Sequence, residues 1–373
     1  MLKVATIVGT RPELIRLARI IARLDACMDH RLVHTGQNYD YELNRIFFDD
    51  LGIRTPDRFL DAAGTNAAET VANVIVRAHA WLAEERPEAI LILGDTNSAM
   101  AAYAAKRLKI PVFHMEAGNR CFDERVPEEI NRRIVDHISD INLPYSDRAR
   151  EHLIREGLAP DRVIKTGSPL NEVLQHYHPR IEASDVLARL GLQAGGYFVA
   201  SAHREENVDD PARLAALAAL LEAVAERHGL PVILSTHPRT QARLAAAGIQ
   251  FGERVRTLKP LGFFDYIHLQ QHARAVLSDS GTLIEEAALL GLRAVNLRDT
   301  HERMEGMEEG AAVMSGLSRR RVLEALDLLA GTPAMPRPVT DYLARDVAEK
   351  VARIIQSYTD YVVRNTWKQI PSV

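Results

Sequence analysis

Three acidic side chains stand at positions from which they could transfer protons. Asp95 and Glu116 each follow a short apolar run, 89–93 and 111–114, and Glu128 belongs to a Pro-Glu-Glu sequence a few residues further on. The carboxyl ends of parallel strands meet at one rim of a sheet, where a poorly solvated carboxylate has its pKa raised towards the range of proton transfer. A rim of salt bridges is the alternative, because four arginines lie near in the sequence: Arg120, Arg125, Arg132 and Arg133. Three acids in one cluster favour the catalytic interpretation.

The sequence 9–13 has the residue types of an anion site at the start of a helix. Thr10 can cap the helix, and Pro12 suits its first turn. Arg11, with Arg16 near the same face, adds positive charge at the positive end of the helix dipole. An ordinary capped helix with solvated arginines is the alternative.

A second candidate anion site follows the apolar run that ends at residue 277. Ser280 and Gly281 present small side chains and free N–H groups, which let phosphate oxygens approach a helix start closely. Glu285 and Glu286 would repel a diphosphate, so we expect at least one of them to accept hydrogen bonds from ribose hydroxyls. The alternative is that both only stabilise the helix dipole.

Two histidine and arginine pairs follow neighbouring predicted strands. They are His203 with Arg204, and His237 with Arg239. A single histidine is more often structural than catalytic. Two such junctions side by side, however, predict positive groups that can stabilise a departing or returning diphosphate.

These residues need a scaffold, and the chain alternates short β-branched runs with stretches of helical period. The predicted strands are 3–8, 31–34, 89–93, 111–114, 141–143 and 163–165, then 197–201, 232–235, 254–258, 275–277 and 294–297. A helix is predicted over 211–228, ended by Gly229. Uncharged apolar strands of this kind are typical of parallel sheets covered on both faces. The pattern predicts an α/β protein with two Rossmann-like, doubly wound domains.

The expected domains are residues 1–170, with the carboxylates, and residues 171–373, with the nucleotide site. The hinge is placed near 168–185, where a Gly/Pro turn precedes a polar stretch. A last helix over about 341–363 could pack back on the first domain. Doubly wound sheets bind ligands outside the carboxyl ends of their strands, so the two domains should face each other across one cleft.

Composition and missing motifs exclude several classes of function. With 47% hydrophobic and 26% charged residues and a net charge of -4, the chain fits a soluble enzyme that does not bind nucleic acid. Its two cysteines are far apart and suggest neither disulfide nor zinc, and no run is long enough for a membrane span or signal peptide, so a cytoplasmic location is expected. G-x-G, P-loop and D-x-D patterns do not occur. We therefore expect no metal and no redox cofactor.

Taken together, the motifs resemble those of the non-hydrolysing UDP-N-acetylglucosamine 2-epimerases along nearly the whole chain. The matching sequences are 9–13 (GTRPE), 94–96 (GDT), 116–118 (EAG), 127–132 (PEEINR), 203–207 (HREEN), 279–281 (DSG) and 298–300 (RDT). The resemblance implies the GT-B arrangement of two domains, a homodimer, and UDP held mainly by the C-terminal domain.

The resemblance also implies roles for individual residues. The catalytic positions are Asp95, Glu116, Glu128 and His203. Arg11 and Ser280 match diphosphate positions, Glu286 a ribose position, and Tyr266 an aromatic position near the base. The remaining expected substrate or UDP contacts are Arg16, Arg132, Arg204, His237, Gly281 and Arg303.

Departures from the family pattern bear on the substrate. The segment 119–126, which the resemblance places beside the sugar, is shorter than in common members, Ile284 replaces a frequent Gln, and Met304 replaces a usual Pro. The last two departures put an allosteric substrate site in doubt. With 35–40, 46–50 and 262–266, the chain is most similar to the capsule and O-antigen branch, whose enzymes convert UDP-2-acetamido-2,6-dideoxy-β-L-talose to UDP-N-acetyl-L-fucosamine.

The expected reaction is elimination of UDP to a 2-acetamidoglycal, followed by re-addition, because the C2 proton lies beside no carbonyl. Epimerisation of UDP-N-acetylglucosamine to UDP-N-acetylmannosamine is the alternative within the family. Three further alternatives are a UDP-sugar-dependent glycosyltransferase, a hydrolysing epimerase and a non-catalytic nucleotide-sugar binding protein.

Overall fold

The structure, a computed structural model, describes residues 1–36, 41–236 and 238–369. It divides into two compact units, Met1–His176 with Thr340–Val373 (unit 1) and Tyr177–Val339 (unit 2). Each unit contains its own parallel sheet of six strands. The predicted α/β class with two doubly wound sheets is therefore confirmed.

Unit 1 has its parallel strands in the order β3-β2-β1-β4-β5-β6. From β1 the chain adds β2 and β3 on one side, then returns to add β4, β5 and β6 on the other, so the order of addition reverses between β1 and β4. The carboxyl ends of these two strands are where a doubly wound sheet binds ligands. The elements are β1 (Lys3–Val8), α1 (Arg11–Cys27), β2 (Asp29–His34), α2 (Tyr41–Leu51), β3 (Arg58–Phe59), α3 (Ala67–Glu85), β4 (Ala89–Leu93), η1 (Asn97–Met100), α4 (Ala101–Arg107), β5 (Val112–Met115), α5 (Pro127–Ile138), β6 (Ile141–Leu143), α6 (Asp147–Arg155), η2 (Pro160–Arg162), α7 (Leu170–Glu182, which continues into unit 2), η3 (Thr340–Tyr342) and α16 (Val347–Thr366).

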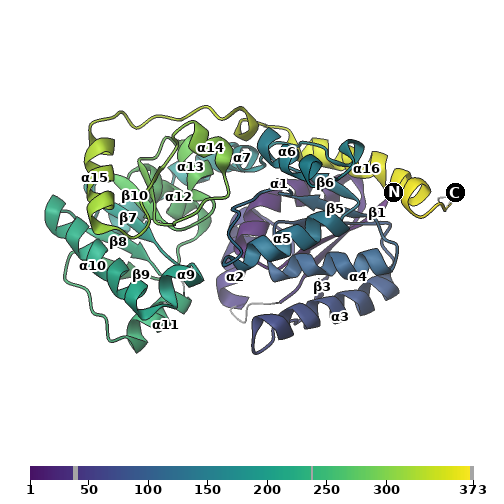
Figure 1. Cartoon of the computed structure of the whole chain (residues 1–373), viewed down its shortest axis with the longest axis horizontal. Coiled ribbons are helices and arrows are strands. Elements are labelled where there is room, and N and C mark those ends of the chain that lie inside the picture. The colour runs from purple at the N-terminus through teal and green to yellow at the C-terminus, as the bar shows by residue number, and fades with distance from the viewer. Residues whose placement is uncertain (37–40, 237, 370–373) are drawn as a thin grey trace. The chain divides into compact units, whose positions relative to one another are not determined.

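The core of unit 1 packs its central strands against the helices on one face of the sheet. Ile90 and Ile92 of β4 and Val112 of β5 are buried in one apolar cluster with Val74 of α3 and Val135 of α5. α3 contacts α4, and α4 contacts α5, along this face, whereas α1 contacts α2 and α16 (Figure 1). Apolar residues at successive strand positions are what burial on both faces of a parallel sheet requires.

Unit 2 repeats the same strand order, β9-β8-β7-β10-β11-β12, with the reversal between β7 and β10. Its elements are α8 (Val186–Leu190), β7 (Phe198–Ser201), α9 (Glu205–Val208), α10 (Pro211–His228), β8 (Val232–Ser235), α11 (Pro238–Ala246), β9 (Val255–Leu258), α12 (Phe263–Gln271), β10 (Ala275–Ser278), α13 (Leu283–Leu290), β11 (Ala294–Asn296), α14 (Met304–Glu308), β12 (Val313–Met314) and α15 (Arg319–Ala330).

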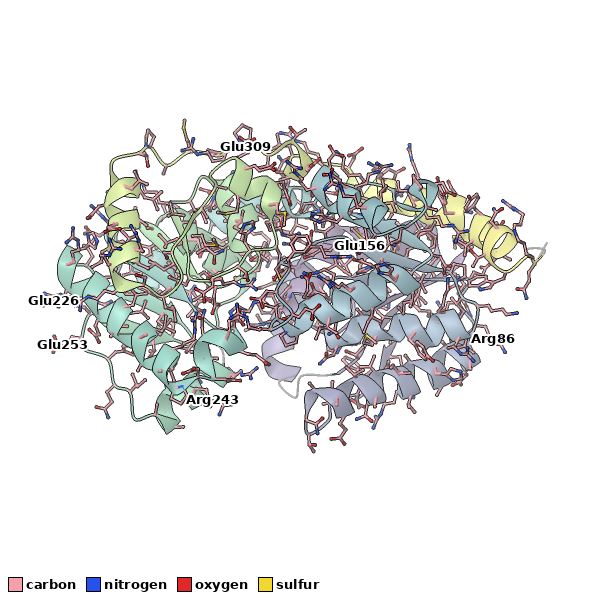
Figure 2. The ribbon with its side chains drawn as sticks, in the orientation of Figure 1. Arg86, Glu156, Glu226, Arg243, Glu253 and Glu309 are labelled. Carbon is pink, nitrogen blue, oxygen red and sulfur yellow. The ribbon has the colours of Figure 1, made fainter. Side chains whose placement is uncertain are left out.

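Helix α10 shows how local sequence sets an element of unit 2. Asp210 caps it by accepting hydrogen bonds from the next turn, and Gly229 ends it at a φ of 64°, as its sequence predicts. Leu217 and Leu221 pack into the unit 2 core. The charged residues lie outside, as Glu226 on α10 shows in Figure 2.

Three details differ from the sequence predictions. Residues 163–165 form no strand, because only Val163 makes a bridge, to Asn142. The edge strands β3 and β12 were not predicted, since two residues each are too short to show a pattern. The first unit extends to residue 176 rather than 170.

The C-terminal segment belongs to unit 1 and not to a unit 171–373. α16 contacts α1, where Arg23 Nε donates to Glu349 Oε2 at 2.6 Å. Lys350 Nζ donates to the carbonyl of Lys165 at 2.6 Å, and Lys165 pairs with Asp341 at 2.7 Å. Unit 2 is thus inserted, in chain order, between two parts of unit 1.

No helix in the described part of the chain is both long enough and apolar enough to cross a membrane. Nor do the described residues contain a group of three or more His, Cys, Asp or Glu side chains placed to hold a metal ion.

Candidate functional site

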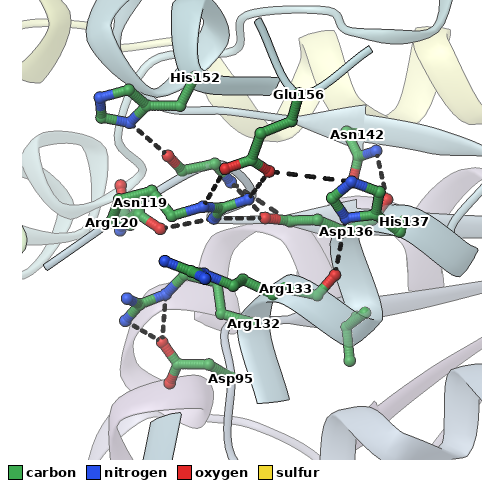
Figure 3. Close-up of polar contacts among 12 residues, drawn as sticks. Asp95, Asn119, Arg120, Arg132, Arg133, Asp136, His137, Asn142, His152 and Glu156 are labelled. Carbon is green, nitrogen blue, oxygen red and sulfur yellow. Dashed lines mark hydrogen bonds and ion pairs between the residues drawn. The ribbon is translucent and has the colours of Figure 1, made fainter. Parts of the chain in front are cut away.

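Asp95 lies directly beyond Gly94 at the carboxyl end of β4, and α5 holds it in place. Arg132 Nε donates to its Oδ2 at 2.9 Å, and Arg132 Nη2 bonds the same oxygen (Figure 3). Asn131 Nδ2 donates to the Asp95 carbonyl at 3.0 Å. The Asp95 side chain remains 16% exposed, so a carboxylate oxygen is held at a fixed place at the edge of the sheet.

Glu116 follows β5, the strand next to β4, in a backbone conformation that residues with a side chain rarely adopt. Its φ is 64°, in the left-handed region, and the side chain is 13% exposed. Arg16 Nε lies 3.7 Å from its Oε2, and Asn119 Nδ2 lies 3.5 Å from its Oε1. Unfavourable backbone conformations occur mainly where the surrounding structure imposes them, often at functional sites.

A buried ionic cluster bonds the residues on both sides of Glu116. Asp136 accepts hydrogen bonds from Gly118 N at 3.2 Å and from Arg120 Nη1 at 2.7 Å, and lies 3.0 Å from His114 Nδ1. Arg120 also pairs with Glu156 (Figure 3). Burial alone would raise the pKa of Asp136, but His114 and Arg120 hold that pKa below its usual value. The cluster keeps Asp136 ionised and the turn closed.

Gly118 is required where the turn approaches α6. Its φ is 82°, and a Cβ atom there would lie 2.3 Å from the carbonyl oxygen of Ala149. Only glycine fits such a backbone-to-backbone approach.

The adjacent glutamates of α5 separate into two environments. Glu129 is fully buried, bonds Arg132 Nη1 at 2.7 Å and accepts from Cys121 N at 3.0 Å. Glu128 is half-buried in the same helical turn. Arg132 therefore links Asp95 to Glu129, and Glu129 anchors the segment 119–126 that precedes the helix.

Arg11 and Arg16 begin and continue α1, beyond the end of β1. The Arg11 guanidinium lies 5.5 Å from the ring centre of Phe47, and Arg16, 2% exposed, lies 5.7 Å from that of Tyr145. Glu13 between them is also buried and accepts hydrogen bonds from Gly9 N and Thr10 N. Burial raises the pKa of Glu13 to about 7, although its hydrogen bonds act in the opposite direction.

The buried state of Glu13 predicts a pH dependence of stability. Between its ordinary pKa of 4.5 and its folded pKa of about 7, the native state binds more protons than the unfolded chain. The contribution of Glu13 to the free energy of unfolding is therefore fully present below pH 4.5. It falls by about 3 kcal/mol in total as the pH rises to about 7. We expect the difference in unfolding free energy between wild type and Glu13→Gln to change accordingly in urea titrations across this window. A difference that does not vary with pH would contradict the buried, protonatable state of Glu13.

In unit 2 a buried aspartate organises the corresponding strand ends. Asp279, directly after β10, accepts hydrogen bonds from His203 N and Arg204 N, each at 3.1 Å, and from Asn207 Nδ2 at 3.0 Å. His203 Nδ1 lies 3.4 Å from Asp279 Oδ1, and the His203 side chain is 39% exposed. Asp279 thus fixes the turn after β7 and orients the imidazole.

Ser280 and Glu286 are joined through one hydroxyl. Thr282 Oγ1 lies 3.0 Å from Ser280 Oγ and donates to Glu286 Oε1 at 2.7 Å. Gln270 Nε2 donates to the other oxygen of Glu286 at 3.0 Å. Burial, and secondly the charge of Glu286, raises the pKa of Tyr266. Ser280, Thr282, Glu286 and Gln270 therefore form one connected group.

Arg204 and Arg303 lie within a charged cluster next to this group. Arg204 Nη2 is 3.8 Å from Glu302 Oε1, and a Cβ at Gly281 would lie 3.3 Å from the same nitrogen. Arg303, 3% exposed, is 3.8 Å from the buried Glu285. Glycine at 281 thus lets a guanidinium approach the start of the turn.

The structure groups the predicted residues by unit. Unit 1 holds the first set near the ends of β1, β4 and β5: Arg11, Arg16, Asp95, Glu116, Glu128 and Arg132. Unit 2 holds the second near the ends of β7 and β10: His203, Arg204, Tyr266, Ser280, Gly281, Glu286 and Arg303. His237 and residues 37–40 of the motif 35–40 lie outside the described residues. The roles of all these residues stay predictions.

Sequence reasoning missed the buried partners of these residues. Glu13, Glu129, Asp136 and Asp279 are each almost or fully buried and each bonds a turn that carries a predicted site residue. The only signal for Glu129 is its spacing of three from Arg132, which puts both side chains on one face of α5.

The chain is similar along most of its length to known sugar-nucleotide 2-epimerases. Residues 22–356 match the family model described as UDP-N-acetylglucosamine 2-epimerase. A UDP-2,3-diacetamido-2,3-dideoxy-D-glucuronate 2-epimerase from Pseudomonas aeruginosa is 33% identical over 87% of this chain and 91% of its own length. The solved UDP-N-acetylglucosamine 2-epimerase from Rickettsia bellii is 46% identical, covers 99% of this chain and 100% of its own, and has a TM-score of 0.92. The Methanocaldococcus jannaschii UDP-GlcNAc 2-epimerase, solved with UDP-GlcNAc and UDP, is 30% identical, covers 95% of this chain and 100% of its own, and has a TM-score of 0.90.

Proposed function

Since this chain belongs to the UDP-N-acetylglucosamine 2-epimerase family, and is thus an isomerase that inverts C2 of a UDP-sugar, we propose that it converts UDP-2-acetamido-2,6-dideoxy-β-L-talose to UDP-N-acetyl-L-fucosamine. The observation that carries the mechanism is the pair Asp95 and Glu116. These carboxylates end adjacent strands, remain 16% and 13% exposed, and each lies beside a buried arginine.

The proposed reaction removes the C2 proton together with the bond from C1 to the UDP oxygen. A carboxylate accepts the proton, the C–H electron pair forms the C1–C2 double bond of a 2-acetamidoglycal, and UDP leaves with the electron pair of the C1–O bond. In the return step a carboxylic acid protonates C2 on the opposite face while UDP adds to C1. Without this coupling, loss of the C2 proton would leave an unstabilised carbanion.

The unit 1 carboxylates Asp95, Glu116 and Glu128 are proposed to carry the protons. The leaving diphosphate gains negative charge, so Arg11, His203 and the Ser280 turn are proposed to stabilise it. Two sets of contacts support this division: the arginine-held acids of unit 1, and in unit 2 the hydrogen bonds that join Ser280 through Thr282 to Glu286. A homodimer and a place in capsule or O-antigen synthesis are proposed from the resemblance alone.

The segment 119–126 supports a 6-deoxy sugar. It is anchored by Glu129 and the Arg120 pairs, and Phe122 within it has a φ of 55° and is 61% exposed. An exposed aromatic ring would suit the C6 methyl group of such a sugar better than a hydroxymethyl group. UDP-N-acetylglucosamine is the second candidate substrate, favoured by the names of the Rickettsia bellii and Methanocaldococcus jannaschii proteins.

Turnover in deuterium oxide tests the mechanism. We expect proton NMR to show product deuterated at C2 with either UDP-N-acetyl-L-fucosamine or UDP-N-acetylglucosamine as starting material, and faster conversion of the former. Epimerised product without deuterium would contradict elimination. Free sugar with an equivalent of UDP would instead indicate a hydrolysing enzyme, and no change without an acceptor would indicate a glycosyltransferase or a binding protein.

A further inference from the structure

Glu13 connects two turns that are far apart in the sequence. Its Oε2 accepts hydrogen bonds from Gly9 N at 2.5 Å and Thr10 N at 3.0 Å, which lie in the turn after β1. Its Oε1 accepts from the Thr96 hydroxyl at 2.5 Å, in the turn after β4. A glutamate at this place in a helix ordinarily bonds only its own first turn. Glu13 therefore spans the point where the strand order of unit 1 reverses.

The contact with Thr96 fixes the backbone beside Asp95 from a second side. α5 already holds the Asp95 carboxylate through Arg132 and the Asp95 carbonyl through Asn131. The Thr96 hydroxyl, which also accepts from Ser98 N at 3.2 Å, ties the following residue to the start of α1. Asp95 is thus held between α5 and α1.

The Glu13 carboxylate also holds the turn after β1, which directly precedes Arg11. Gly9 and Thr10 are bound through one oxygen of Glu13 and Thr96 through the other, so the carboxylate acts as a rigid spacer between the two turns. Glu13 is 2% exposed, so water does not compete for these bonds.

We propose that Glu13 is a positioning residue of the epimerase. Through the Thr96 hydroxyl it sets the spacing between the turn after β4, which carries Asp95, and the turn after β1, which leads into Arg11. The inference rests on the proposed function, in which Asp95 carries a proton and Arg11 stabilises the diphosphate. Displacement of a reacting group by about 1 Å can cost about 100-fold in rate. Loss of the Thr96 contact should therefore lower kcat, and loss of the Glu13 carboxylate should also raise KM.

The test uses variants that remove one contact at a time in the full chain. Thr96→Val deletes the hydroxyl at nearly constant volume and should lower kcat about tenfold to 100-fold with KM within about twofold. Thr96→Ser should restore most of kcat. Glu13→Gln should lower kcat and raise KM, and the double variant should lose no more kcat than Glu13→Gln alone, because both changes remove one contact.

Glu69→Gln is the matched control. Glu69 also lies in the first turn of a helix in unit 1, but it is exposed, and among the described residues its carboxylate bonds the backbone and hydroxyl of Thr65, just before that helix. Its variant should therefore keep wild-type kcat and KM. Hydrogen exchange gives a second reading that needs no activity: amides of residues 94–100 should exchange faster in Thr96→Val than in wild type or Glu69→Gln.

Separate results distinguish the two proposals. A wild type that converts no UDP-sugar would remove the proposed function, and unchanged exchange at 94–100 would then remove the positioning role as well. An active wild type with kcat within twofold in Thr96→Val, or with multiplicative losses in the double variant, would overturn the positioning role alone. If Thr96→Val does not fold, the test falls to Glu13→Gln. Unchanged kcat and KM in that variant would overturn the positioning role of Glu13.

Discussion

Glu116→Gln should lower kcat for epimerisation by about 10²- to 10⁴-fold, the contribution usual for a positioned acid or base. The amide keeps the shape of the side chain and its place beside Asn119 and Arg16, but it cannot accept or deliver a proton. Of the proposed substrate and UDP contacts, Arg11, Arg16 and Arg132 lie in unit 1 and the others in unit 2, and the substitution removes none of them. The dissociation constant for UDP, measured by calorimetry, should therefore stay within about twofold. The rate is followed by proton NMR.

The outcome for Glu116 can be separated from a general loss of structure. Glu226→Gln, at the exposed end of α10, is the matched substitution and should leave kcat unchanged (Figure 2). If Glu116→Gln kept a kcat within threefold of wild type, Glu116 would be neither acid nor base, and Asp95 and Glu128 would remain as the proton carriers.

Asp136→Asn should destabilise the folded chain by about 3–5 kcal/mol, the usual cost of breaking a buried ion pair. The amide would leave Arg120, which is fully buried, without its charge partner on that side. It would also place an NH₂ group near the donors Gly118 N and Arg120 Nη1. The loss is measured by urea unfolding at neutral pH.

Asp147→Asn provides the comparison for Asp136. Asp147 pairs with Lys165 at 2.8 Å but is 77% exposed, so this change should cost about 1 kcal/mol at most. Equal effects of the two substitutions would show that the cluster around Asp136 does not determine the stability of unit 1. A destabilised but folded Asp136→Asn should also lose activity, because the Glu116 turn depends on it.

The central strands of both sheets were predictable because their burial leaves a direct record in the sequence. β1, β4 and β8, which lie inside the sheets, match the predicted ranges at both ends, since each is a mainly apolar run bounded by polar or Gly/Pro residues. The edge strand β6, which is fully buried, matches as well. Edge strands β3 and β12 bury little and have two residues each, so no period can be recognised. Residues 163–165 look like a strand but find only a single bridge.

The site was predictable at the level of strand ends but not of partners. A polar residue after an apolar run marks the rim of a parallel sheet, which located Asp95, Glu116 and His203. Contacts across long sequence separations, such as the one between Glu13 and Thr96, leave no local pattern. The difference in burial between Glu128 and Glu129 also leaves no local pattern, because adjacent positions of a helix differ only in the direction they face.

The order in which the chain is synthesised acquires a meaning from the placement of α16. The ribosome makes the first part of unit 1, then all of unit 2, and only then the helix that covers α1. Domains generally fold as units during synthesis, so unit 2 can finish folding while the nascent unit 1 still exposes the surface of α1. A chaperone that protects this surface would have to remain bound until residues 347–366 have emerged.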